Sequence, residues 1–125
     1  GWRGLVDGIL TKAVESYRQP SKLLAWIGPA ISQQNFEVGH EVRERFINKS
    51  SSLESFFRPK TGQKWFCDMV AIAKHELEGL GVDVFESDLC TYHNSQDFFS
   101  HRRATHQQGS NAMTGRMASI IWIEQ

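Results

Sequence analysis

The sequence predicts a mixed α/β fold in a single domain that covers residues 1–125. Two kinds of pattern lead to this prediction: segments with helical spacing of apolar residues, and short apolar runs typical of strands. The composition agrees with it, because 40% of the 125 residues are hydrophobic and 11% are aromatic. A chain of this size buries about two thirds of its unfolded surface, so it needs neither a disulfide nor a metal to form a core.

Three segments show the spacing of amphipathic helices. Apolar residues recur at helical intervals across 5–17, and Pro20 ends that helix. Residues 38–46 carry an apolar side chain every fourth position in a charged background, which predicts a second helix. Residues 64–80 predict the clearest helix, and Gly81 follows where a C-terminal cap is expected.

Short apolar runs predict three strands. Residues 23–27 form a continuous apolar run, which is typical of a strand covered on both faces in a parallel or mixed sheet. Residues 82–85 alternate apolar with polar, and 117–123 are almost uninterrupted apolar, so both are predicted as strands. We expect a loop over 31–39. The stretch 87–116 has no clear periodicity, and loops of that length are usually functional or disordered.

The charge balance excludes several classes of function. Fourteen basic and fourteen acidic residues give a net charge of zero, which removes the whole-surface attraction that nucleic-acid and membrane binders use. No apolar run approaches the 18 or so residues that span a bilayer. We expect a cytoplasmic protein that binds neither nucleic acid nor membrane and that can form a homo-oligomer. Cys67 and Cys90 are predicted to be free thiols, and the start at Gly1-Trp2-Arg3-Gly4 suggests a cut chain.

Four possible metal ligands lie close together in the long loop. Cys90, His93, His101 and His106 could in principle supply a tetrahedral zinc site, but their spacing matches no compact zinc finger. Histidines in an irregular polar loop are more often solvated or hydrogen-bonded, so no metal site is predicted in this chain. His75 is expected on the solvated face of the helix over 64–80.

Five residues are candidates for binding an anionic, ring-bearing ligand. Phe98 and Phe99 lie next to Arg103, and Arg116 follows nearby in the sequence. Arg side chains pair bidentately with phosphate or carboxylate, and aromatic rings stack on bases. Arg3, at the start of a helix, is a further anion-binding candidate. The alternative is a solvated basic loop with one Phe in the core.

Several motifs, in order, resemble one protein family. The chain resembles the bacterial polyphenol oxidase, or laccase-domain, family, whose members are also described as purine nucleoside phosphorylases and peptidoglycan-editing factors. The match covers essentially the whole chain, and each motif alone is weakly specific. The motifs are Gly1-Trp2-Arg3-Gly4, Ala25–Ile31 with Gly28-Pro29, Phe36-Glu37-Val38-Gly39, Asp88-Leu89-Cys90-Thr91, Phe98–Arg103 and Thr114–Ser119.

The resemblance implies a fold shared with cytotoxic-necrotizing-factor-like cysteine hydrolases, incomplete at its N-terminus. It also implies a zinc or copper site made of one Cys and two His, all of which the family places before Gly1. His101 stands where the family would have Tyr. On this basis the chain is the C-terminal part of the enzyme, with substrate-side residues, no catalytic or metal-ligating residue and no cofactor of its own.

The resemblance further implies phosphorolysis of purine nucleosides, with adenosine deamination attributed to the same site. Purine nucleoside and phosphate are then the expected substrates. One Cys and two His fit zinc at least as well as copper, which favours this reaction over phenol oxidation. Two alternatives stay open: a copper-dependent polyphenol oxidoreductase, and a non-catalytic folded fragment or interaction module.

Overall fold

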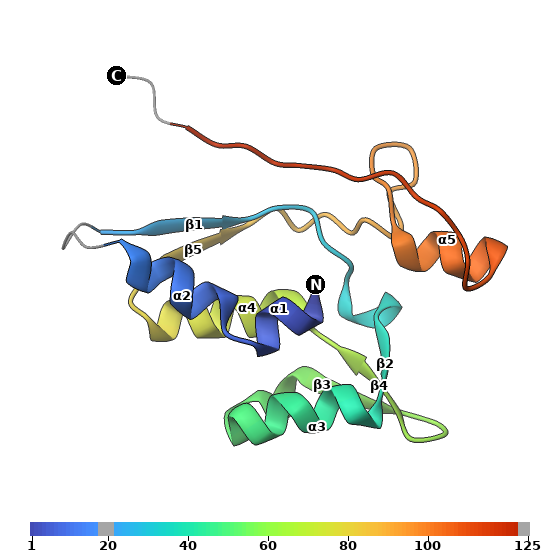
Figure 1. Cartoon of the computed structure of the whole chain (residues 1–125), viewed down its shortest axis with the longest axis horizontal. Helices are drawn as coiled ribbons and strands as arrows, with labels where there is room; N and C mark the ends of the chain where they lie inside the picture. Colours follow the sequence, from blue (N-terminus) through green and yellow to red (C-terminus); the bar gives the residue numbers. More distant parts are fainter. Residues whose placement is uncertain (18–21, 123–125) are drawn as a thin grey trace.

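The computed structural model describes residues 1–17 and 22–122, and it confirms a mixed α/β architecture (Figure 1). Two 3₁₀ turns join the regular elements. In chain order the elements are α1 (Trp2–Val6), α2 (Ile9–Ser16), β1 (Leu24–Ile27), η1 (Gln33–Asn35), β2 (Glu37–Gly39), α3 (His40–Lys49), η2 (Ser51–Phe56), β3 (Phe57–Lys60), β4 (Lys64–Cys67), α4 (Met69–Gly79), β5 (Asp83–Glu86) and α5 (His101–Gln108).

The strands form two small sheets. Strands β1 and β5 pair in parallel, with Leu24 opposite Asp83 and Ile27 opposite Glu86. The other sheet is antiparallel, with the order β2-β4-β3. Helix α4 contacts both β1 and β5. In Figure 1, α2 and α4 lie on one side of the parallel pair, and the extended C-terminal segment runs along the other side.

The core lies between the antiparallel sheet and the helices α1, α3 and α4. Phe46, Leu53, Cys67 and Ile72 are its largest fully buried side chains. The rings of Phe46 and Phe57 meet at a centroid distance of 5.8 Å, which ties α3 to β3. Burying such side chains contributes roughly 1.5–3 kcal/mol each, so this cluster stabilises the platform on which the parallel strands sit.

Two of the predicted helices need correction. The helix expected over 5–17 is divided into α1 and α2, because Gly8 has φ of 80° and interrupts the helical backbone. The helix expected over 64–80 begins only at Met69. Residues 64–67 form β4, which finds a partner strand on each side, and the Asp68 side chain then accepts a hydrogen bond from the backbone N–H of Ala71 as the helix cap.

The predicted end of that helix is confirmed. Gly81 has φ of 78°, and its N–H donates to the carbonyl of Glu78 at 3.0 Å. The N–H of Val82 donates to the carbonyl of Leu77 at 3.1 Å, and both of these side chains are buried. These two bonds and the apolar contact define a Schellman motif, which turns the chain directly into β5.

The helix predicted over 38–46 and the loop predicted over 31–39 also differ from the structure. The helix α3 begins at His40, and Val38 belongs to β2. The loop contains the turn η1 and strand β2. The apolar repeat is compatible with both assignments, and pairing with β4 decides in favour of the strand.

The strand predictions succeed in part. Residues 23–27 and 82–85 are confirmed as β1 and β5. The expected cover on both faces of β1 is absent among the described residues, since Leu24 is 67% and Trp26 is 47% exposed. Residues 117–122 are extended without being a strand, because no described strand pairs with them, and residue 123 of that prediction lies outside the described residues. None of the described helices is long and apolar enough to cross a membrane.

Candidate functional site

A cavity of about 200 Å³ opens where β1 and β5 end. Its wall combines residues that follow β1, residues that follow β5, and Asp68 and Val70 at the start of α4. The two strands are parallel, so their carboxyl ends lie at the same edge of the sheet. Ligands of open α/β sheets bind in the crevice at that edge. The cavity is therefore the first candidate site of the molecule.

The segments that follow β1 and β5 remain hydrogen-bonded to each other at the cavity. The N–H of Ala30 donates to the carbonyl of Leu89 at 3.1 Å, and the N–H of Thr91 donates to the carbonyl of Ala30 at 3.0 Å. Ala30 and Cys90 thereby form a parallel bridge. This bridge fixes the side chain of Cys90 in the cavity wall.

Hydrogen-bond donors surround the sulfur of Cys90. The Sγ atom lies 3.1 Å from Ser32 Oγ, 3.4 Å from the backbone nitrogen of Ser32 and 3.6 Å from Asn35 Nδ2. Burial alone would raise the pKa of this thiol. The hydrogen bonds from Ser32, together with the backbone N–H groups of His93 and Tyr92, outweigh burial and lower the pKa of Cys90 to about 7.

Three carboxylates also line the cavity, each held by a different element. Asp68 caps α4, and Glu86 accepts a hydrogen bond from Lys74 Nζ at 2.5 Å. Asp88 is exposed and has φ of 54°, a backbone conformation that Asp adopts more readily than most residues. Carboxylate oxygens accept hydrogen bonds only, so this wall suits a ligand that carries hydroxyl or N–H groups.

The structure brings together two of the motifs with candidate substrate residues. The ring of Phe99 lies against Gly115, where an added Cβ would come within 2.6 Å of ring atoms and would require the ring to move. The backbone N–H of Phe99 donates to Met117 Sδ at 3.3 Å. Arg116 therefore lies in a segment that packs beside Phe99.

The same segment passes the cavity. Ser119 Oγ lies 3.3 Å from the position that a Cβ on Gly28 would take, and Gly28 lines the cavity. Arg116 precedes Ser119 by three residues, which in extended chain span at most about 10 Å. Arg116 is thus within reach of the cavity rim.

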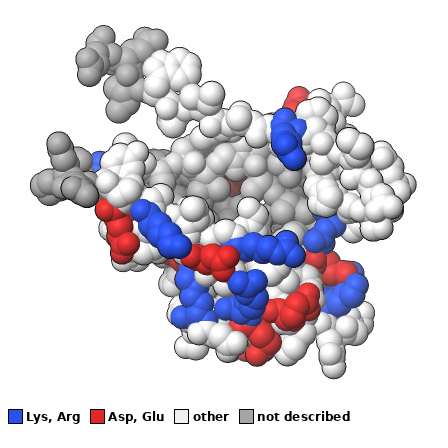
Figure 2. All heavy atoms as spheres, viewed as in Figure 1, with Lys and Arg blue, Asp and Glu red and all other residues white. Residues whose placement is uncertain are grey.

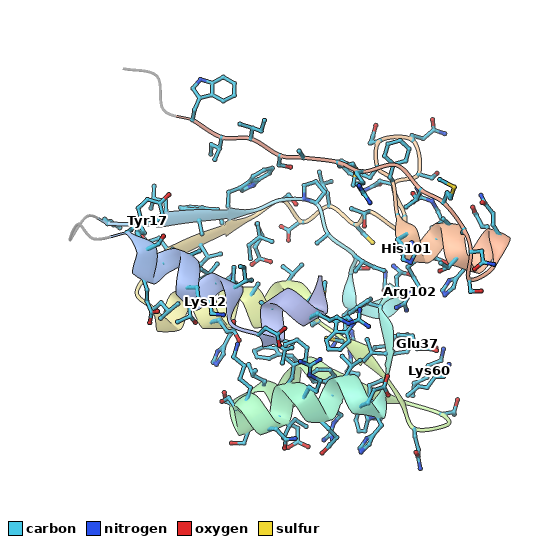
Figure 3. All side chains as sticks on the ribbon, in the orientation of Figure 1. Lys12, Tyr17, Glu37, Lys60, His101 and Arg102 are labelled. Carbon is cyan, nitrogen blue, oxygen red and sulfur yellow. The ribbon has the colours of Figure 1, made fainter. Side chains whose placement is uncertain are left out.

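Arg103 and Arg102 bind backbone carbonyls. Arg103 Nη1 donates to the carbonyls of Thr91 at 2.6 Å and Tyr92 at 2.9 Å, and Nη2 donates to the carbonyl of Phe98 at 2.5 Å. Arg102 Nη1 donates to the carbonyl of Glu37 at 2.5 Å, and Figure 3 shows Arg102 at the start of α5 above Glu37. Arg103 thereby joins α5 to the loop of 91–98, whereas Arg102 joins α5 to β2.

Arg3 lies on another side of the candidate region. Its guanidinium carbon is 4.7 Å from the centroid of the Trp2 ring. The neighbouring Gly1 and Gly4 line a second, apolar cavity of about 350 Å³, which shares Ile27, Ala30 and Val70 with the first. Among the contacts of the described residues, none joins the guanidinium of Arg3 to that of Arg103 or Arg116.

Comparison with known proteins assigns the chain to a family. Residues 1–124 match the family described as multi-copper polyphenol oxidoreductase laccase. The chain belongs to this laccase family. The purine nucleoside phosphorylase YfiH of Escherichia coli K12 is 41% identical to it over 125 residues, covering 98% of this chain and 48% of that protein. The Haemophilus influenzae purine nucleoside phosphorylase is 36% identical, covering 99% and 50%.

Two solved structures resemble the fold of this chain. A Neisseria meningitidis protein matches with a TM-score of 0.78 at 31% identity, over 91% of this chain and 46% of that one. The Bacillus licheniformis protein YfiH matches with a TM-score of 0.76 at 26% identity, over 91% and 45%. The chain spans about half the length of the relatives it matches.

The histidines of this laccase-family chain do not fit a metal centre. His93 Nε2 pairs with Gln34 Nε2 at 3.1 Å, and His106 Nδ1 pairs with the hydroxyl of Tyr92 at 2.9 Å. Among residues 1–17 and 22–122, no group of three or more His, Cys, Asp or Glu is arranged to hold a metal ion. His75 is exposed and packs on Phe56, in agreement with a solvated helix face.

Sequence reasoning missed the cavity residues Ser32, Asp88 and Cys90 as a set. Each follows a predicted strand within a few residues, and both strands were assigned correctly. Recognising the two strands as parallel neighbours would have placed these residues at one sheet edge. The charged side chains visible in Figure 2 gather instead over α3 and the strands beside it, with both signs interspersed.

Proposed function

We propose that this chain provides the substrate-binding wall of a purine nucleoside phosphorylase, which uses a purine nucleoside and phosphate. The observation that carries the proposal is a cavity at the carboxyl ends of β1 and β5 in a chain 41% identical to a purine nucleoside phosphorylase. The chain spans about half of that relative, so the activity belongs to a longer protein.

The cavity has the chemistry to hold a nucleoside. Asp88 and Glu86 offer carboxylate oxygens to the hydroxyls of a ribose, while Ile27, Val70 and Leu89 offer apolar contacts to the faces of a purine. Phe99 contributes a ring beside the segment that carries Arg116, and Phe98 precedes it in the chain. Such a mixture of apolar wall and few polar groups is typical of small-molecule sites.

Arg116 is the residue proposed to bind phosphate, with Arg3 as a second contributor. In phosphorolysis a phosphate oxygen bonds to the anomeric carbon of the ribose, and the bond from that carbon to the purine nitrogen breaks. The electron pair leaves with the purine, which takes up a proton. A guanidinium beside the phosphate neutralises its charge and holds it in position for attack. Arg103 is not assigned to phosphate, because its guanidinium donates to backbone carbonyls.

The proposal includes a metal, zinc or copper, whose ligands lie outside these residues. The described donors do not fit a metal centre, so the reaction steps above assign it no role. Adenosine deamination at the same site, the cytotoxic-necrotizing-factor-like fold, a cytoplasmic location and a homo-oligomeric state belong to the same proposal. They are supported by the resemblance of the motifs.

Replacing Arg116 by Ala tests the phosphate assignment. Inosine phosphorolysis is measured on the 125-residue chain and on a version extended upstream of Gly1. In the active version, Arg116→Ala loses a charge-assisted contact of about 1.5–3 kcal/mol, so the KM for phosphate rises roughly 10- to 100-fold while the fold is retained. Lys12→Ala, which removes an equally positive but distant side chain on α2, is the control. An unchanged KM for phosphate in a folded Arg116→Ala enzyme contradicts the assignment.

A second candidate is copper-dependent oxidation of phenols, which the description of the matched family favours. The extended version, loaded with copper, is supplied with a phenol and oxygen, and with inosine and phosphate in parallel. Phenol turnover without phosphorolysis supports the oxidoreductase. Turnover of neither substrate supports an interaction module, to which the exposed apolar side chains of β1 and 117–122 are suited.

A further inference from the structure

A single turn of chain lies between the sulfur of Cys90 and the guanidinium of Arg103. The N–H of Asn94 donates to the carbonyl of Cys90 at 3.0 Å, which closes this turn over residues 90–94. Cys90 stands at its first position, where a side chain can accept hydrogen bonds from the free N–H groups that follow. The N–H groups of Tyr92 and His93 contribute to lowering the pKa of Cys90, although less than the hydrogen bonds from Ser32 do.

Arg103 binds the opposite side of the same two peptide units. Its Nη1 donates to the carbonyls of Thr91 and Tyr92 at 2.6 and 2.9 Å. In a trans peptide unit the C=O and the N–H point in opposite directions. Arg103 therefore binds the carbonyl oxygen of two successive peptide units, Thr91–Tyr92 and Tyr92–His93. The N–H of each unit points the opposite way, toward the sulfur.

The position of Arg103 is itself fixed by the helix that carries it. Ser100 is buried and caps α5, and its Oγ accepts the backbone N–H of Arg103 at 3.3 Å. Arg103 Nη2 is anchored on the carbonyl of Phe98 at 2.5 Å, which leaves Nη1 for the turn. A planar guanidinium with several donors in fixed directions can bridge these three carbonyls, whereas a lysine ammonium cannot hold the same geometry.

We propose that Arg103 is a positioning residue, which holds two peptide units so that their N–H groups face the Cys90 sulfur inside the cavity. Charge-assisted bonds at the carbonyls polarise the peptide units and strengthen the hydrogen bonds on their far side. This increases the fraction of Cys90 that is present as the thiolate near neutral pH. Resting on the proposed function, the anionic sulfur accepts a hydrogen bond from a donor group of the bound nucleoside.

Other charged groups face Cys90 from the elements around the cavity. Asp68 on α4, Glu86 at the end of β5 and Asp88 beyond it line the same cavity, and each opposes a negative sulfur. Glu86 is paired with Lys74, and His93 on the turn directs its Nε2 to Gln34. Among the described residues, Asp68, Glu86 and Asp88 make no hydrogen bond to Arg103, so we expect their effects to be the same in wild type and in Arg103→Lys.

The test is the pH dependence of alkylation of Cys90 by iodoacetamide, followed by mass spectrometry of the labelled peptide. In the wild-type chain the rate is expected to titrate near pH 7. In Arg103→Lys the rate at pH 7 is expected to fall by roughly two- to threefold, because the hydrogen bonds from Ser32 to the sulfur remain, whereas the rates at pH 10 converge. Cys67 is an internal control, because burial raises its pKa to about 12 and it is fully enclosed.

Arg102→Lys is the matched control. Arg102 is the neighbouring residue and also donates to a backbone carbonyl, that of Glu37, but it makes no bond to the turn of Cys90. Its replacement is expected to leave the titration of Cys90 unchanged. A folded Arg103→Lys protein with the wild-type titration overturns the proposal, as does a wild-type Cys90 that titrates near pH 8.5.

A measurement on the wild-type chain decides the matter if Arg103→Lys does not fold. The amide resonances of Tyr92 and His93 are expected to titrate with the midpoint of Cys90 alkylation, and amides that do not respond overturn the proposal. Nucleoside turnover by the extended version is recorded separately. If Arg103→Lys shifts the titration of Cys90 but the extended version turns over no nucleoside, the positioning role stands and the proposed function is rejected. If the extended version is active but the titration of Cys90 is unshifted, the proposed function stands and the positioning role is rejected.

Discussion

Glu37, in β2, makes hydrogen bonds to residues of β3, β4 and α5. Its carboxylate accepts hydrogen bonds from Lys60, at the end of β3, and from Lys64 Nζ at 2.6 Å, at the start of β4 (Figure 3). Its backbone carbonyl accepts from Arg102 at 2.5 Å. The hydrogen bonds from Lys60 and Lys64 lower the pKa of Glu37 to about 2. This residue therefore connects the antiparallel sheet to the helix that positions the loop of Cys90.

The lowered pKa of Glu37 predicts a pH-dependent stability. Because its pKa is lower in the folded than in the unfolded state, the carboxylate stabilises the fold above its ordinary pKa of about 4.3, and that contribution is lost as pH falls toward 2. Both lysines are substantially exposed, so we expect Glu37→Gln to cost no more than about 1 kcal/mol at pH 7. Urea denaturation at pH 7 and pH 2 measures this difference. A cost that is equal at both pH values contradicts the prediction.

At the scale of elements, helix α4 has a capping motif at each end. Asp68 caps the first turn, and the Schellman motif at Gly81 ends the helix and leads into β5. Since Asp68 and β5 both border the cavity, the two caps also set the position of α4 against it. The helix length therefore influences the shape of the candidate site.

Two glycines near the end of α4 are expected to respond in opposite directions to alanine. Gly81→Ala forces a side chain into a backbone with φ of 78°, which costs about 1–2 kcal/mol. Gly79 lies in the helix with nothing within 4 Å of an added Cβ, so Gly79→Ala stabilises the protein by roughly 0.5–1 kcal/mol. Chemical denaturation of both variants is the measurement. Equal signs would show that the cap does not depend on the left-handed glycine.

Local sequence patterns correctly predicted the elements whose structure depends on residues close to them in the sequence. The Schellman glycine and the strands β1 and β5 were recognised because turn and apolar signals coincide there. The start of α4 was not, because residues 64–67 satisfy helical spacing as well as strand spacing, and only the partners β2 and β3 select the strand. Residues 117–122 show the opposite case: their composition is typical of a strand, but no described strand pairs with them.

The candidate site was harder to predict for a similar reason. Residue types suggested Phe99 and Arg116 as substrate-binding residues; the structure places them in adjacent segments, and their role stays a prediction. For Arg103 the residue type indicated anion binding, yet the carbonyls of the nearby turn take up its donors. Which acceptors surround an arginine depends on contacts between loops, and such contacts leave no periodic signal in the sequence.

The whole molecule exposes an apolar face along its parallel sheet. Trp26 and Phe85 are cross-strand neighbours, 47% and 59% exposed, and Ile120 and Ile121 in the adjacent segment are each 78% exposed. An apolar area of this kind on one face is unusual for a monomeric protein and marks an interaction surface or an aggregation hazard. The side of the parallel strands that α4 does not cover is thus open to binding.

This face predicts binding of a hydrophobic fluorescent dye by the folded 125-residue chain. Replacing Trp26 and Phe85 together by Ser is expected to reduce the dye signal by more than half, because it removes the two largest exposed rings of the sheet. Met113→Ser is the control, since Met113 is 90% exposed and lies just beyond α5, outside the parallel sheet. A dye signal that is unchanged in the double variant would place the binding elsewhere.

The distribution of donors predicts that the 125-residue chain binds no stoichiometric metal. The side chains of Cys90, His93 and His106 already have protein hydrogen-bond partners, and their geometry is unsuited to a shared ion. Elemental analysis after dialysis against zinc or copper measures the bound metal. One tightly held ion per chain, lost in Cys90→Ala, would contradict this prediction.

The extended segment 113–122 has a consequence for proteolysis. Its backbone forms no helix or strand, and Met113 is 90% exposed, so the segment can enter a protease active site without unfolding of the core. Trypsin should cleave after Arg116 earlier than at sites within α3 or α4. Anything that covers the open sheet face, whether an upstream segment or a second chain, would slow that cut, and the digestion rate would then report occupancy of the face.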